Sequence, residues 1–173
     1  MEDLIIYSST DGQTKKICET IKAHISSNNN FKIISLNEAL NLNLEKCKKI
    51  ILGASIRYGK HNKNFLNFVI KNKNILNSKK TAFFSVNVVA RKKEKSTPET
   101  NPYVIKFLKK TNWKPSKLSV FAGKVDYPNY NFINRNVIRF IMKITKGPTD
   151  INNSYEFTNW ENVRKFAKEV ENL

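Results

Sequence analysis

A short run near the start of the chain combines residue types that bind phosphate groups. An apolar segment, residues 4–7, is followed at once by a polar run that contains four hydroxyl side chains and one glycine. This run is Ser8, Ser9, Thr10, Asp11, Gly12, Gln13 and Thr14. Where a strand gives way to a helix, the first backbone N–H groups of the helix lack partners inside it and carry a partial positive charge. The loop contains no Lys or Arg and no Walker spacing, so its uncharged donors favour a phosphate monoester over a nucleoside triphosphate.

The residues of this loop have different expected roles. The candidate phosphate ligands are Ser9, Thr10, Gly12, Gln13 and Thr14. A side chain at Gly12 would block the approach of the backbone to the phosphate. Ser and Thr are also common helix caps, so simple capping is the alternative interpretation. The carboxylate of Asp11 would repel a phosphate, and we expect it to turn away and accept backbone N–H groups.

Apolar runs alternate with amphipathic segments along the chain. Runs rich in Ile, Val or Phe predict strands at residues 4–8, 31–35, 49–53, 81–86 and 118–122. Helical periodicity between them predicts helices at about residues 13–26, 62–74, 103–111 and 160–172, with an irregular connection at residues 37–44. Strands separated by helices imply right-handed βαβ units and a parallel sheet.

This alternation predicts a single α/β domain over residues 1–173, a doubly wound five-stranded parallel sheet in the order 2-1-3-4-5. An insert at about residues 124–150 lies outside the minimal pattern, and Tyr155, Glu156 and Phe157 after it are expected to complete the sheet edge. In such sheets a ligand binds at the switch point, beside strands one and three. The segments after strands three and four, residues 53–61 and 85–92, therefore join the first loop at the candidate site.

Several motifs occur in order along almost the whole chain. They are Asp11-Gly12-Gln13-Thr14, Gly53-Ala54-Ser55-Ile56-Arg57-Tyr58-Gly59, Ser85-Val86-Asn87, Ala90-Arg91-Lys92, Thr97-Pro98, Tyr127-Pro128 and Thr158-Asn159-Trp160-Glu161. The three loops resemble those of the flavodoxin superfamily. The ordered set resembles, more narrowly, the flavodoxin-like bacterial protoporphyrinogen oxidases of the HemG type, which are quinone-dependent dehydrogenases. The Asp at position 11 departs from the general flavodoxin pattern and agrees with the narrower one.

The resemblance implies a flavodoxin-like enzyme that holds FMN, oxidises protoporphyrinogen IX to protoporphyrin IX in haem synthesis, and passes electrons to a membrane quinone, menaquinone or ubiquinone. The flavin carries the chemistry, so no protein nucleophile and no metal site are expected. Tyr58 is the candidate to pack near the flavin ring. The implied FMN-binding residues are Ser9, Thr10, Asp11, Gly12, Gln13, Thr14, Ser55, Ile56, Arg57, Tyr58, Gly59, Ser85, Val86, Asn87, Val88 and Val89.

A basic loop follows strand four, next to the expected flavin edge. Arg91 and Lys92 are the candidates to bind the propionates of a porphyrinogen, because a guanidinium suits a carboxylate. Solvated surface charge is the alternative. The two histidines, His24 and His61, are expected at the surface, and a proton-transfer role for His61 is the alternative.

The insert contains an amphipathic segment that starts at Phe132. A helix there places Ile133, Val137, Phe140, Ile141 and Ile144 along one face, and Arg135, Arg139, Lys143 and Lys146 along the opposite one. Such a helix can lie in an anionic membrane surface. Tyr127 and Tyr130 ahead of it suit a membrane interface or, alternatively, a packed loop. The alternative is a helix that packs its apolar face on the domain. Gly147 and Pro148 end it.

The net charge narrows the functional classes. Thirty-one basic and fourteen acidic residues give +17, which attracts anionic partners and disfavours a flavodoxin that only carries electrons between proteins. The sequence contains no recognition element of a nucleic-acid-binding domain and no dinucleotide fingerprint of an NAD(P)H:quinone reductase.

Cys18 and Cys47 have no metal-ligand spacing. The acidic start of the chain is not a secretory signal, and no apolar stretch spans a bilayer, so we expect a cytoplasmic protein, peripheral on the cytoplasmic face of the cell membrane.

Overall fold

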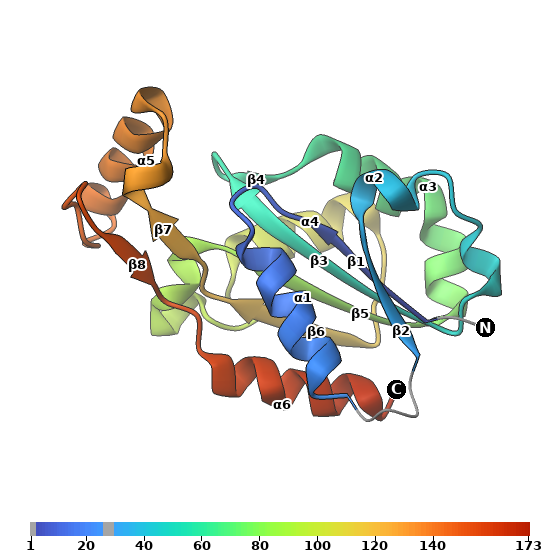
Figure 1. Ribbon diagram of the computed structural model, residues 1–173. Helices are drawn as coiled ribbons and strands as arrows, with labels where there is room; N and C mark the ends of the chain where they lie inside the picture. The colour runs from blue at the N-terminus through green and yellow to red at the C-terminus, as the bar shows by residue number, and fades with distance from the viewer. Residues whose placement is uncertain (1–2, 26–29) are drawn as a thin grey trace.

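A parallel sheet of five strands forms the centre of the computed structural model, which describes residues 3–25 and 30–173 (Figure 1). Its strands are β1 (Asp3–Ser8), β2 (Phe31–Ser35), β3 (Lys49–Arg57), β5 (Lys80–Val86) and β6 (Lys117–Phe121). They lie in the order β2-β1-β3-β5-β6, which confirms the predicted order of the five parallel strands. Each predicted strand is present, and β3 continues four residues past its predicted end.

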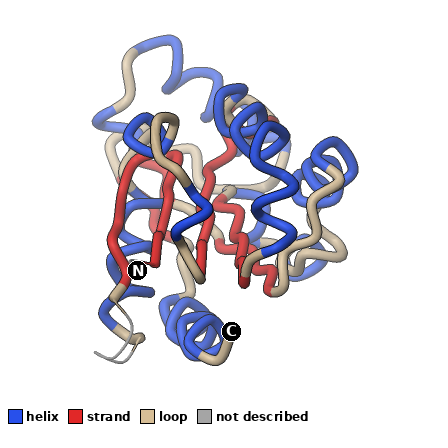
Figure 2. The backbone as a smooth tube through the Cα atoms, turned by 90° about the vertical axis from the view of Figure 1, so that its right-hand side faces the viewer, coloured by secondary structure: helices blue, strands red, loops and turns tan. Residues whose placement is uncertain are grey.

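Helices cover both faces of this sheet (Figure 2). The main helices are α1 (Gln13–Ala23), α3 (Lys63–Ser78), α4 (Pro102–Thr111) and α6 (Trp160–Glu171), with a short α2 (Leu36–Ala39). Single-turn 3₁₀ helices are η1 (Leu44–Lys46), η2 (Val88–Arg91), η3 (Lys93–Lys95) and η4 (Tyr127–Asn129). The four main helices were predicted. Residue 26, the predicted end of the first helix, lies outside the described residues.

Alternation along the strands divides the core into two layers. Ile5 of β1 packs with α1 and α6, through residues such as Ile17 and Phe166. Its neighbours Leu4 and Ile6 point to the other face and pack with α3 and α4. Successive side chains of a strand point to opposite faces, so a run of apolar residues is required where both faces are covered. This arrangement leaves the carboxyl ends of the strands, and the loops after them, at one edge.

A tight hairpin extends β3 beyond the sheet. β4 (Lys60–His61) pairs antiparallel with the end of β3, with Arg57 opposite Lys60. The two connecting residues, Tyr58 and Gly59, both have positive φ, 50° and 75°. A two-residue turn with this backbone matches the twist of the strands that it joins. The hairpin was not predicted, because the polar residues at the end of β3 were interpreted as a loop.

The insert forms a separate lobe beyond the carboxyl end of the sheet (Figure 1). β7 (Lys124–Asp126) and β8 (Ser154–Glu156) pair antiparallel in a two-stranded sheet of their own, with α5 (Phe132–Ile144) between them in the sequence. The expectation that residues 155–157 complete the main sheet is therefore wrong. The lobe has a small core of Val125, Tyr127 and Met142.

No helix in the described part of the chain is long and apolar enough to cross a bilayer.

Both cysteines are buried: Cys18 lies on α1, and Cys47 follows η1.

Candidate functional site

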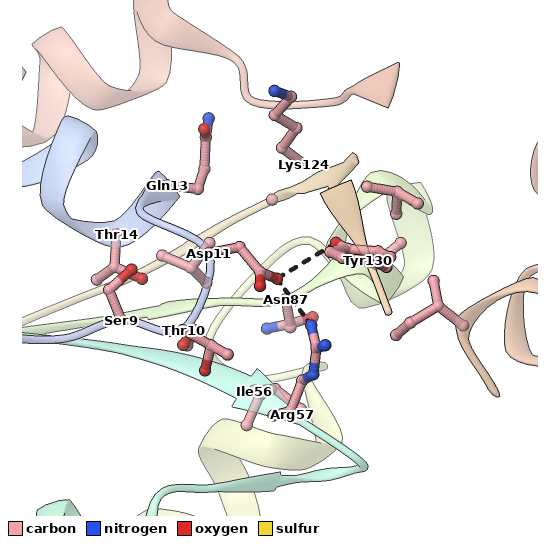
Figure 3. Close-up of a pocket in the computed structure, with 16 residues that line it drawn as sticks. Ser9, Thr10, Asp11, Gln13, Thr14, Ile56, Arg57, Asn87, Lys124 and Tyr130 are labelled. Carbon is pink, nitrogen blue, oxygen red and sulfur yellow. Dashed lines mark hydrogen bonds and ion pairs between the residues drawn. The ribbon is translucent and has the colours of Figure 1, made fainter. Parts of the chain in front are cut away.

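The loops at the carboxyl edge of the sheet enclose a cavity, the switch-point cavity (Figure 3). It lies between the loop after β1, the end of β3, the end of β5 and the start of the insert. Its lining residues are Ser9, Thr10, Asp11, Gln13, Thr14, Ser55, Ile56, Arg57, Val86, Asn87, Val88, Gly123, Lys124, Val125, Tyr130 and Ile138. The three predicted loops thus meet at one place, beside β1 and β3.

The start of α1 differs from the start of the other helices. Side chains of Ser35, Asn62, Asn101, Asn131 and Asn159 accept hydrogen bonds from the first turns of α2, α3, α4, α5 and α6, respectively. The N-cap of α1 is Gly12, at φ 84°, and no side chain in the described part of the chain caps that helix. A β-carbon at Gly12 would face open space, so the left-handed backbone is what requires glycine there. The Oγ of Ser9 accepts the N–H of Gly12 itself, at 3.0 Å.

After the uncapped start of α1, the buried hydroxyl of Thr14 is a second observation that indicates a ligand site. Its side chain is fully buried, and its Oγ1 has no hydrogen-bond partner among the described residues. A buried hydroxyl without a partner is costly. Together with the uncapped N–H groups of α1, this oxygen forms a set of uncharged donors that fits the phosphate monoester of a cofactor such as FMN.

Asp11 takes side-chain partners rather than the backbone partners that we expected. Its Oδ2 accepts from Nη1 of Arg57 at 2.8 Å and from the hydroxyl of Tyr130 at 3.2 Å (Figure 3). The prediction that the carboxylate accepts backbone N–H groups is therefore wrong. Because Arg57 lies over the ring of Tyr130, at 5.0 Å from its centroid, the three residues join both loops to the insert.

The amide of Gln13 also links the loop to a distant segment. Its Nε2 donates to Oγ1 of Thr158 at 2.8 Å and to Oε1 of Glu156 at 3.2 Å. The hydroxyl of Thr158 in turn donates to the carbonyl of Ala122, at the end of β6. The side chain of Gln13 thus fixes the loop against β8 and the segment that follows it, and the predicted phosphate-binding role of Gln13 stays a prediction.

A buried polar network supports the loop after β5. Asn87 accepts from Ala90 N–H and from Nδ2 of Asn101, and its own Nδ2 contacts Oγ of Ser85 at 3.3 Å. Ser85 continues the network to Nε2 of His61, at 3.0 Å. These bonds hold the polypeptide that lines the cavity in one conformation.

His61 does not have the plain surface position that we expected. Its ring packs against Phe107, with centroids 4.8 Å apart, and near Phe83 and Phe65. Burial lowers the pKa of His61 to about 4, so its imidazole is neutral at physiological pH. His24 is exposed, as expected.

Five of the predicted FMN-binding residues lie outside the lining of the switch-point cavity. Gly12 forms the loop turn, and Ser85 is buried behind Asn87. Tyr58 is half exposed, and its hydroxyl donates to Oδ1 of Asn134 in α5. Gly59 follows it in the hairpin turn, and Val89 is half-buried in η2. The structure therefore joins Tyr58 to the insert at the rim of the site.

The lining also includes residues that the sequence analysis missed: Gly123, Lys124, Val125, Tyr130 and Ile138. All follow β6 or belong to the insert. The switch-point rule predicts a ligand beside the loops after the first, third and fourth parallel strands, so it does not predict a contribution from the segment after the fifth strand. The one available indication was that Tyr130 lies close to the Tyr127-Pro128 motif of the insert.

Arg91 fastens the insert to the domain. Its guanidinium donates to the carbonyl of Val88 and to both the carbonyl and the hydroxyl of Thr145, at 2.8–2.9 Å. A β-carbon at Gly147 would come within 2.7 Å of this guanidinium and closer still to Cε of Met142, so a side chain there would displace the ends of both side chains. The predicted substrate role of Arg91 and Lys92 stays a prediction.

The exposed side chains of α5 do not support the alternative in which its apolar face packs on the domain. The helix packs into the small core of the insert through Met142 and Ile138. Its exposed large side chains are Phe132, Ile133, Phe140 and Ile144, with exposed fractions of 64–72%. Tyr127 is fully buried, and its hydroxyl donates to the carbonyl of Pro148, so of its two expected positions it takes the one in a packed loop.

The strand order and the uncapped loop after β1 define a flavodoxin-like protein. A family model described as a flavodoxin domain matches residues 4–152. Among solved structures, flavodoxin 1 of Bacillus cereus has a TM-score of 0.55 at 18% identity, over 98% of this chain and 97% of that one. A flavoprotein of Lactobacillus acidophilus, solved in complex with FMN, has a TM-score of 0.50 at 17% identity, over 69% and 92%.

Curated relatives are more similar in sequence. Protoporphyrinogen IX dehydrogenase [quinone] of Escherichia coli K12 is 38% identical over 174 residues, 100% of this chain and 96% of that protein. The protein of the same name from Leishmania major is 41% identical over 168 residues, 96% of this chain and 73% of that protein. The chain belongs to the flavodoxin-domain family and, within it, to the family of the quinone-type protoporphyrinogen IX dehydrogenases.

Proposed function

We propose that this protein oxidises protoporphyrinogen IX to protoporphyrin IX in haem biosynthesis, with a membrane quinone as the electron acceptor. Six hydrogen atoms leave the substrate in three two-electron oxidations. In each, two electrons and two protons reduce one quinone to its quinol, so the reaction balances. The observation that carries the proposal is the full-length similarity to the E. coli dehydrogenase, at 38% identity.

FMN is the proposed resident cofactor, and it supplies the transfer of electrons between substrate and quinone when bound. The N–H groups at the start of α1 and the hydroxyl of Thr14 would hold its phosphate. The backbone at Ile56 and Asn87, at the neighbouring ends of β3 and β5, would border its ring. The carboxylate of Asp11 is neutralised by Arg57, which removes its repulsion of a nearby phosphate.

The test is anaerobic mixing of the FMN-loaded protein with protoporphyrinogen IX and a quinone. We expect porphyrin fluorescence to rise only when both substrates are present. Protein that binds FMN but forms no porphyrin would overturn the proposal and favour the alternative, a flavodoxin-type electron carrier. Protein without FMN is the control for spontaneous oxidation of the substrate.

The position of α5 supports peripheral contact with an anionic membrane surface, where a quinone acceptor resides. Residues Phe132, Ile133, Phe140 and Ile144 form an apolar face directed away from the domain. Arg139 and Lys143 are exposed on the same helix, next to this face. Apolar side chains that enter the acyl boundary beside cations facing anionic headgroups are the pattern of an interfacial helix.

Co-sedimentation with vesicles tests this contact. The double variant Ile133→Ser with Phe140→Ser should bind anionic vesicles about tenfold more weakly, because it removes two large apolar side chains from the proposed contact. The matched control, Ile70→Ser with Ile105→Ser, removes two side chains that are 48% exposed on α3 and α4, and should bind normally. Equal binding by both variants would overturn the assignment of α5 to the membrane.

A further inference from the structure

A second cavity, the α3–α4 cavity, opens on the other side of the β3–β4 hairpin. It has a volume of about 340 Å³ and lies between β4 and the facing sides of α3 and α4. Its lining residues are Ile56, Gly59, Lys60, His61, Lys63, Leu66, Asn67, Tyr103, Lys106, Phe107 and Lys110. None of these lining residues is an Asp or Glu, so the cavity combines apolar walls with a rim of one charge.

The side-chain ammonium groups of the four rim lysines have no ion-pair or hydrogen-bond partner among the described residues, and all four residues are exposed. The hollow at the opposite edge of the sheet also has four lysines, and two of them, Lys49 and Lys79, donate to the carbonyls of Glu171 and Glu45, at 2.8 and 2.7 Å. Unpaired cations around a concave surface repel one another, and an anionic ligand removes that repulsion.

The floor of the cavity is aromatic. The rings of His61 and Phe107 pack with centroids 4.8 Å apart and are tilted by 58° to one another, and Phe107 also packs against Phe65 and Phe83. The imidazole is held by Ser85 and is neutral. The floor therefore presents an uncharged aromatic surface with an angle between its rings, which suits a non-planar apolar ligand.

The α3–α4 cavity adjoins the proposed cofactor site, because the two share a lining residue. Ile56 lines both this cavity and the switch-point cavity. A third hollow, at the hairpin, shares Lys60, His61 and Lys63 with the α3–α4 cavity. It shares Thr10, Ser55 and Arg57 with the switch-point cavity. A ligand seated on His61 and Phe107 thus lies next to the site proposed for FMN.

We infer that the α3–α4 cavity seats the tetrapyrrole substrate, with its propionate edge at Lys60, Lys63, Lys106 and Lys110. This inference rests on the proposed function. A porphyrinogen is a large apolar macrocycle whose two carboxylates lie on one edge, which matches a cavity with an apolar floor and a cationic rim. An ammonium–carboxylate pair is a charge-assisted hydrogen bond, stronger than a neutral one. The rim lysines then fix the orientation of the macrocycle toward the hairpin.

The test compares two double variants that remove equal charge. Lys106→Gln with Lys110→Gln changes the rim, and Lys48→Gln with Lys80→Gln changes the opposite edge of the sheet, at the starts of β3 and β5. We expect the rim variant to bind protoporphyrin IX about tenfold more weakly in a fluorescence titration, and to raise KM for protoporphyrinogen IX by a similar factor. The control should match the wild type in both, with FMN affinity unchanged throughout.

A second ligand separates carboxylate recognition from general attraction. Protoporphyrin IX dimethyl ester keeps the macrocycle and lacks the two negative charges. The wild type should bind the ester more weakly than the free acid, and the rim variant should bind the ester as the wild type does. A rim variant with wild-type affinity and KM, or equal weakening in the control, would overturn the assignment of the cavity. Failure of the wild type to oxidise protoporphyrinogen IX would instead overturn the proposed function.

Discussion

At the scale of single residues, the site depends on groups that the fold leaves without partners. Thr14, the second residue of α1, is buried with an unpartnered hydroxyl, while Asp11 and Gln13 beside it are engaged by other side chains. The sequence predicted the loop from its residue types. It did not distinguish these roles, because the partners of Asp11 and Gln13 lie between 46 and 145 residues away along the chain.

Replacement of Thr14 by Val tests the unpartnered hydroxyl. We expect FMN affinity to fall by about 10- to 100-fold, because a hydrogen bond to a charged phosphate is lost. The free energy of unfolding without FMN should stay the same or rise, since no bond within the protein is broken. Thr81→Val is the matched control: its Oγ1 is also buried and unpartnered, at the start of β5. Titration of both variants with FMN measures the difference, and equal affinities would contradict the assignment.

At the scale of elements, the local sequence pattern predicted the main helices and the parallel strands, and it did not predict the pairing of β7 with β8. Apolar runs found all five parallel strands, because both faces of that sheet are covered. β7 and β8 have three residues each and contain Lys, Asp, Ser and Glu, so they carry no periodic signal. The amphipathic pattern found α5, but it could not tell which face the domain covers, since that depends on Met142 and Ile138 meeting the core of the insert.

Arg91 connects the end of α5 to the main domain, and its replacement tests that role. Arg91→Gln removes three hydrogen bonds to Val88 and Thr145, so we expect the insert to loosen by about 1–2 kcal/mol. Hydrogen exchange of residues 132–147 should accelerate about tenfold, with KM for the porphyrinogen unchanged. Lys92→Gln is the neighbouring control. A raised KM with unchanged exchange would instead support the predicted role in substrate binding.

At the scale of the whole molecule, stability depends on the net charge and on titratable groups whose pKa values the fold lowers. The chain carries a net charge of +17, and the buried aromatic cluster contains one titratable ring, His61. The Asp126 carboxylate accepts from Lys124, Ser154 and Asn129, which lowers its pKa to about 2. Burial lowers the pKa of His61 from its ordinary value near 6.5 to about 4.

Acid sensitivity therefore follows from His61. Between pH 6.5 and 4 the unfolded chain binds a proton that the folded chain excludes, so stability falls as the pH falls through this window. The contribution is about 3 kcal/mol over the window. Denaturant unfolding at several pH values should show a shallower fall for His61→Gln than for the wild type. His24→Gln, at an exposed position, should follow the wild type, and parallel curves for all three proteins would contradict the buried, neutral imidazole.

The buried thiol of Cys18 has a practical consequence. The side chain lies four residues after Thr14 on α1, has no exposed surface, and its pKa is raised by burial. Alkylating reagents attack the thiolate in water, so Cys18 reacts only while α1 is separated from the sheet. Mass spectrometry of its alkylation over time therefore gives the frequency of that opening in the native protein, without a substitution in the chain.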